Sequence, residues 1–92
     1  MDARIEKAVL AKIAEAISGT GEIAKIKQSL GQIPVGSPTD FAFGIAIGRI
    51  YNSFHYQTRR TLKRNATEGE FAEFLDILAK KASEIQDALK QQ

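Results

Sequence analysis

The sequence predicts an all-α protein, a small three-to-four-helix bundle with a long antiparallel C-terminal helical hairpin. Valine is scarce, and no stretch alternates apolar and polar residues over five positions, so the pattern argues against β-strands. Apolar residues recur instead at helical spacings along most of the chain. The chain has 92 residues, of which 43% are hydrophobic and 26% charged. We therefore expect a single helical-bundle domain over 1–92 rather than a disordered chain.

A first helix is predicted over about 2–18, and a short second helix over about 22–30. The apolar stripe of the first is Ile5, Val9, Ile13 and Ile17, and that of the second is Ile23, Ile26 and Leu30. The helices are expected to end at Ser18-Gly19-Thr20-Gly21 and at Gly31, because glycine readily adopts the left-handed conformation of a helix C-cap. Residues 32–36 are predicted to form a loop, since the proline among them lacks an amide hydrogen.

Two capping patterns predict where the helices of the hairpin begin. In Ser37-Pro38-Thr39-Asp40 the serine can cap and the proline suits the first helical position, so a helix should run from here to about Arg64. Thr67-Glu68-Gly69-Glu70 is a second capping box, which starts the last helix after a tight turn at Asn65-Ala66. That last helix carries a heptad seam that needs a helical partner: Phe71, Leu75, Leu78, Ala82, Ile85 and Leu89. The short connection makes the two helices antiparallel, and the first two helices are predicted to pack across the open end of the hairpin.

The central helix, residues 41–65, is apolar almost all round near its start. Its expected buried stripe is Phe43, Ile47, Ile50, Phe54, Thr61 and Leu62. Beside that stripe, Gly44 and Gly48 form a GxxxG pair flanked by Ala42 and Ala46. Two glycines in a helix interior cost about 1 kcal/mol each relative to alanine, so we expect another backbone close by, either the first helix or a second copy of the chain. The candidate self-association residues are Phe41, Gly44, Ile45, Gly48 and Asn52.

Basic residues are concentrated in the central helix, although the net charge is only +2. Residues 41–67 hold five basic residues and no acidic one, whereas residues 68–92 hold three basic residues against six acidic ones. Aromatic residues interleave with the basic ones, which is typical of phosphate contacts and base stacking. The candidate nucleic-acid-binding residues are Arg49, Tyr56, Arg59, Arg60, Lys63 and Arg64. The alternative is that the hairpin folds these cations onto the acidic start of the last helix, although Arg49 lies well before the turn.

Few residues offer catalytic or metal-binding chemistry. The chain has no cysteine and a single histidine, His55, so a metal site would need carboxylates as its other ligands. We therefore expect no metal, no cofactor and no catalytic residue. Arg49 and His55, with five residues between them, resemble the Arg-x(4–6)-His motif of HEPN-type ribonucleases. The resemblance covers these two residues alone, and it implies a site shared by two chains in which Arg49 stabilises a phosphate and His55 takes part in acid–base chemistry.

No apolar run approaches the roughly eighteen residues that a membrane-spanning helix needs. The N-terminus lacks the basic and apolar regions of a signal peptide, so we expect a soluble cytoplasmic protein with no membrane partner. The leading hypothesis is a non-enzymatic module that forms a homodimer through the Gly44 and Gly48 side of its central helix. A small nucleic-acid-binding protein is the alternative, and a HEPN-like ribonuclease is the third hypothesis.

Overall fold

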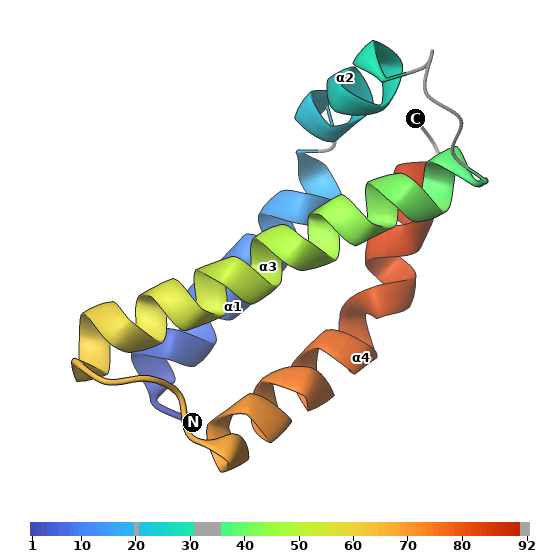
Figure 1. Cartoon of the computed structure of the whole chain (residues 1–92). Helices are drawn as coiled ribbons and strands as arrows, with labels where there is room; N and C mark the ends of the chain where they lie inside the picture. The colour runs from blue at the N-terminus through green and yellow to red at the C-terminus, as the bar shows by residue number, and fades with distance from the viewer. Residues whose placement is uncertain (20, 31–35, 91–92) are drawn as a thin grey trace.

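The computed structural model describes residues 1–19, 21–30 and 36–90, and in these ranges it contains four α-helices and no β-strand. The helices are α1 (Ala3–Ser18), α2 (Gly21–Ser29), α3 (Pro38–Leu62) and α4 (Glu68–Lys90) (Figure 1). The predicted all-α bundle is therefore confirmed. The molecule is elongated: it extends 42 Å along its longest axis and has a radius of gyration of 14.2 Å, against roughly 12 Å for a compact domain of this length.

Both predicted capping motifs form and fix the starts of the long helices. At α3, Ser37 accepts a hydrogen bond from the Asp40 amide at 3.2 Å, and Pro38 occupies the first helical position. At α4 the capping box is reciprocal. The Glu70 amide donates to Thr67 Oγ1 at 3.2 Å, and the Thr67 amide donates to the Glu70 carboxylate at 2.9 Å. These bonds satisfy backbone donors that the first turn of each helix leaves free.

The left-handed C-cap occurs at the end of α3, and not at the end of α1 as predicted. Gly19, the C-cap of α1, has a φ of −110°. Lys63, the C-cap of α3, has a φ of 60° and donates its backbone N–H to the Arg59 carbonyl at 3.0 Å. Glycine suits position 19 for another reason, because a Cβ there would lie 2.9 Å from the Glu15 carbonyl oxygen. The helix end predicted at Gly31, and residues 32–35 of the loop predicted over 32–36, lie outside the described residues.

Helix α1 lies along α3 and also contacts α4 (Figure 1). It begins beside the start of α4, where the amino group of Met1 forms an ion pair with Glu73. The prediction that this helix packs across the open end of the hairpin is therefore wrong: α1 contacts both α3 and α4, and its residues Ile5, Val9 and Ile13 belong to the shared core. Within the described residues, α2 packs only on α3.

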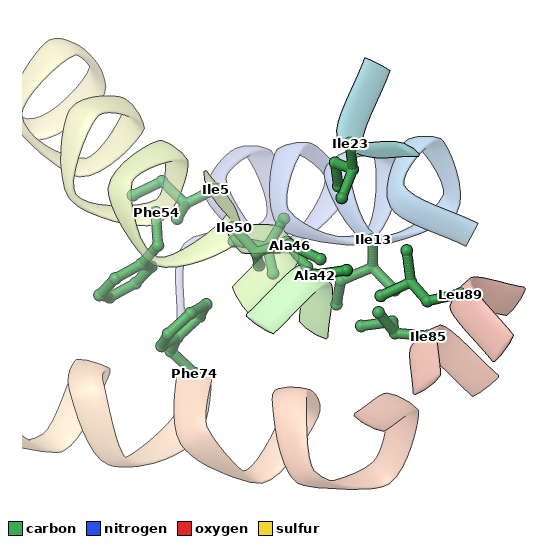
Figure 2. Close-up of a cluster of buried hydrophobic side chains, with 11 residues drawn as sticks. Ile5, Ile13, Ile23, Ala42, Ala46, Ile50, Phe54, Phe74, Ile85 and Leu89 are labelled. Carbon is green, nitrogen blue, oxygen red and sulfur yellow. The ribbon is translucent and has the colours of Figure 1, made fainter. Parts of the chain in front are cut away.

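The core is one cluster of buried apolar side chains to which all four helices contribute (Figure 2). Its members are Ile5, Val9, Ile13, Ile23, Ala42, Ala46, Ile50, Phe54, Phe74, Ile85 and Leu89. The rings of Phe54 and Phe74 stack with their centroids 4.4 Å apart, which ties α3 to α4. In the seam of α4, Phe74 is fully buried where Leu75 was predicted, and Leu75 is 45% exposed. The seam differs because α4 packs against both α1 and α3 rather than against the single partner that a heptad pattern assumes.

The buried face of α3 is built from smaller residues than predicted. Every fourth residue along it is buried: Ala42, Ala46, Ile50, Phe54 and Thr58. Other members of the predicted stripe are partly buried beside this row: Phe43, Ile47, Thr61 and Leu62. The hydroxyl of Thr58 donates to the Phe54 carbonyl at 2.8 Å, so its burial leaves no polar atom without a partner. We call the five buried residues from Ala42 to Thr58, spaced four apart, the inner row of α3.

Candidate functional site

Gly44 and Gly48 face open space on the outer side of α3. Both residues are exposed, and a Cβ added at either one would meet no neighbouring heavy atom of the described residues within 4 Å. The explanation that α1 packs on these glycines is therefore wrong. Ala46 lies against α1 instead (Figure 2), and two residues of separation turn the chain by about 200° around the helix.

The predicted self-association residues form a continuous face on this outer side, which we call the glycine face: Phe41, Gly44, Ile45, Gly48 and Asn52. Phe41 and Ile45 are half-buried at its edge, whereas the two glycines and Asn52 are exposed. The same four-residue step continues along α3 through two more exposed residues, Tyr56 and Arg60. The two glycines of α3 thus stand on an exposed surface of the helix.

A basic hollow of about 400 Å³ lies beside the glycine face, between α3 and α1. It is lined by Lys12, Arg49, Asn52, Ser53, Tyr56, Gln57 and Arg59. Of the predicted nucleic-acid-binding residues, Arg49, Tyr56 and Arg59 meet here, whereas three others do not line the hollow: Arg60, Lys63 and Arg64. Lys12 was missed because it comes from α1, and no local sequence pattern connects it with α3.

The cations of the basic hollow differ in their ion pairs. The guanidinium of Arg49 lies 3.7 Å from the Glu15 carboxylate and 3.9 Å from the Glu22 carboxylate. The ammonium of Lys12 lies 3.3 Å from Glu15. Exposed pairs of this kind contribute little stability and are screened by salt. Arg59, by contrast, forms no ion pair within the part of the chain that the structure describes.

Arg64 is engaged at the start of α4. Its guanidinium donates two hydrogen bonds to the Glu70 carboxylate, at 2.7 and 3.1 Å. These bonds, together with the Thr67 amide, lower the pKa of Glu70 from 4.5 to about 2. The acidic start of α4 therefore neutralises Arg64. This agrees with the alternative that the hairpin folds the cations of the central helix onto the start of the last helix. Among the described residues, neither Arg60 nor Lys63 forms such a pair.

Open hollows also lie at the elbow between α3 and α4. The larger, which we call the elbow hollow, has a volume of about 390 Å³ and is lined by Tyr51, Asn52, His55, Arg59, Asn65 and Ala66. A neighbouring hollow of about 280 Å³ shares Tyr51, His55 and Ala66 and adds Phe71. The ring centroid of His55 lies 4.7 Å from that of Tyr51 and 5.8 Å from that of Phe71. His55 is therefore a half-buried member of an aromatic cluster that opens to solvent on one side.

Arg49 and His55 do not share a hollow. Arg49 lines the basic hollow, and His55 lines the elbow hollow. A separation of six residues turns the helix by about 600°, which leaves the two side chains about 120° apart around its axis. Within one chain the two residues of the ribonuclease-like motif therefore point to different sites, and ribonuclease activity stays a prediction.

Neither a metal centre nor a membrane span is found in the described ranges. No group of three or more metal-ligating side chains is clustered there. No helix there has both the length and the hydropathy needed to cross a bilayer. The chain matches no protein-family model, no curated protein and no solved structure. The candidate sites among the described residues are the glycine face, the basic hollow and the hollows at the elbow.

Proposed function

We propose that the chain is a non-enzymatic module that forms a homodimer through the glycine face of α3. The observation that supports this most directly is the open space outside Gly44 and Gly48. Two interior glycines weaken a helix by about 1 kcal/mol each relative to alanine, and no contact of the described residues requires them to be small. A second backbone that approaches to van der Waals distance does require it.

The spacing of the glycine face determines how two copies of α3 would pack. Gly44, Gly48 and Asn52 form one i±4 row, and rows of this kind interdigitate at a crossing angle of about −40 to −50°. In a twofold dimer the same face of each copy contacts the other. Phe41 and Ile45, half-buried at the edge of the row, supply apolar surface beside the close contact.

The charges along α3 favour an antiparallel crossing. The helix carries Asp40 in its first turn, and Arg59 and Arg60 in its last turn. An antiparallel crossing between Gly44 and Gly48 directs the two basic ends away from each other and opposes the helix dipoles. A parallel crossing places both basic ends on the same side of the dimer, where like charges repel.

Sedimentation velocity over a wide range of protein concentrations, with light scattering at the highest, tests the proposal. We expect a dimer that dissociates on dilution. Gly48→Leu should be a folded monomer, because the larger side chain blocks the approach of a second backbone. Gly69→Leu is the matched control at an exposed glycine of α4, and it should still dimerise. A wild-type chain that stays monomeric at the highest concentration would contradict the proposal.

Single-cysteine variants test the orientation, because the chain contains no cysteine of its own. In the antiparallel dimer, oxidation of a mixture of Gly44→Cys and Gly48→Cys should join unlike chains. Like positions are then displaced by four residues, about 6 Å along the axis. Added to the lateral separation of the two helices, this displacement takes their Cα atoms beyond the roughly 7 Å that a disulfide can bridge. Disulfides within each variant alone would indicate a parallel dimer and leave self-association intact.

A further inference from the structure

Asn52 and Arg59 line both the basic hollow and the elbow hollow. The two depressions, of about 400 and 390 Å³, therefore meet along these residues on the outer side of α3. Arg49 and Arg59 are separated by about 15 Å along the helix, given a rise of about 1.5 Å per residue. At the roughly 3.4 Å per nucleotide of one strand in a stacked helix, such a surface has the length of about four nucleotides, and of fewer where the strand is extended.

The side chains around this double hollow offer the contacts that a nucleic-acid strand uses. Three cations are available for phosphates: Lys12, Arg49 and Arg59. One tyrosine stands at each hollow, Tyr56 at the basic hollow and Tyr51 at the elbow hollow, and they are 53% and 47% exposed. Amide groups that can read base edges line the same surface: Asn52, Gln57 and Asn65.

We propose that the double hollow binds single-stranded nucleic acid. Its phosphates lie against Lys12, Arg49 and Arg59, and its bases stack on Tyr51 and Tyr56. The exposed tyrosine side chains favour a single strand over a duplex. In a duplex the faces of the bases are hidden in the stack, whereas unpaired bases can leave it and stack on aromatic rings. This function does not depend on self-association, since only Asn52 belongs to both the double hollow and the glycine face.

Arg59 is the cation that contributes most to binding. Arg49 lies within ion-pair distance of Glu15 and Glu22, and Lys12 lies within ion-pair distance of Glu15. A phosphate must therefore compete with these carboxylates for the two cations. The guanidinium of Arg59 has no such competitor within the described residues and stands where the two hollows meet. A strand that crosses α3 must therefore pass beside it.

Fluorescence anisotropy of a labelled single-stranded 12-mer and of the corresponding duplex, titrated with the full chain at 50 and 200 mM salt, tests the proposal. We expect the single strand to bind more tightly than the duplex. Three phosphate contacts on a single strand give a salt slope of about −2, so affinity should fall about 20-fold between the two salt concentrations.

Two variants and one control locate the site. Arg59→Glu should weaken binding about 10-fold or more, because a charged hydrogen bond is lost and a repulsive charge is added. Tyr56→Ala should weaken it about 5-fold or more through the loss of one stacked base. Lys80→Glu makes the same change of charge on an exposed residue of α4 that lines neither hollow, and it should bind like the wild type. Circular dichroism confirms that each variant is folded.

Several results would overturn the proposal. One is the absence of binding at 50 mM salt. Another is equal affinity for the duplex, which would indicate general attraction to phosphate rather than recognition of unpaired bases. A third is an equal loss of binding in Arg59→Glu and Lys80→Glu, since net charge alone would then explain the affinity. Binding to vesicles of anionic lipid without binding to the oligonucleotide would also reject it.

Discussion

The two sides of α3 differ in what their small residues do. On the inner row, Ala42 and Ala46 are 2% and 0% exposed and pack within the core. On the outer side, a Cβ added at Gly44 or Gly48 would meet no heavy atom of the described residues within 4 Å. The fold explains the alanines, because both are buried in the core, where larger residues would overpack it. It does not explain the glycines, which is why the outer side is where function should be sought.

Removing a large side chain from the inner row should have the largest effect on stability. Phe54→Ala removes one ring of the stacked pair with Phe74 and should lower the free energy of unfolding by about 3–5 kcal/mol. Tyr56→Ala, two residues further along and on the outer side, should change it by less than about 0.5 kcal/mol. Urea denaturation followed by circular dichroism measures both values. Similar losses in the two variants would mean that both sides of α3 carry core packing.

Substitution by a larger residue should also affect stability differently on the two sides of α3, although by less than the removal of Phe54 does. Ala46→Leu overpacks the contact with α1 and should lower the free energy of unfolding by about 1–3 kcal/mol. Gly48→Leu meets open space, so the monomer should stay at least as stable while self-association is lost. Thermal unfolding and sedimentation of both variants provide the measurement. An unfolded Gly48→Leu chain would show that the outer side is closed by part of the same chain.

Alanine at the outer glycines should raise the stability of the monomer. Gly44→Ala and Gly48→Ala should each increase the free energy of unfolding by up to about 1 kcal/mol, since the helix gains its best former. Gly19→Ala is the contrasting variant: its Cβ would lie 2.9 Å from the Glu15 carbonyl oxygen, so it should lower stability. Urea denaturation at concentrations at which every variant is monomeric tests the difference. A loss of stability at positions 44 and 48 would contradict it.

The smallest expected effect is on the pH dependence of stability. It should distinguish Arg64, which is paired with Glu70, from Arg59, which has no ion pair among the described residues. Hydrogen bonds from Arg64 and the Thr67 amide lower the pKa of Glu70 from 4.5 to about 2. A lowered carboxyl pKa stabilises the fold above the unfolded value, so this contribution is present above about pH 4.5 and is lost as the pH falls toward 2. Glu70→Gln should therefore flatten the dependence of the unfolding temperature on pH in this range. Arg59→Gln should leave that dependence unchanged, and a flattened profile there would place Arg59 in the same pair.

Features that depend on neighbouring residues could be predicted from the sequence. The caps at Ser37 and at Thr67 and Glu70 are such features, because a cap needs only its own side chain and amides two or three residues away. The grouping of Phe41, Gly44, Ile45, Gly48 and Asn52 on one face follows from helical periodicity in the same way.

Features that depend on which helix packs where could not be predicted. Ala42 and Ala46 have the same four-residue spacing as Gly44 and Gly48, so periodicity alone does not say which pair faces α1. The choice between Phe74 and Leu75 was equally open, because both are large and apolar and the answer depends on the position of two other helices. Lys12 reaches the basic hollow only through the packing of α1 on α3.

The inner row and the glycine face of α3 also constrain how this chain could change in length during evolution. Each residue inserted into or deleted from the middle of α3 turns everything beyond it by about 100°. The deletion of two residues between Ala46 and Ile50 would carry Asn52 and Tyr56 into the core and bring Phe54 out of it. Seven residues make almost two whole turns and restore the phase to within about 20°. Length variants of this helix should therefore differ by whole turns, whereas single-residue insertions and deletions should be confined to the connections between helices.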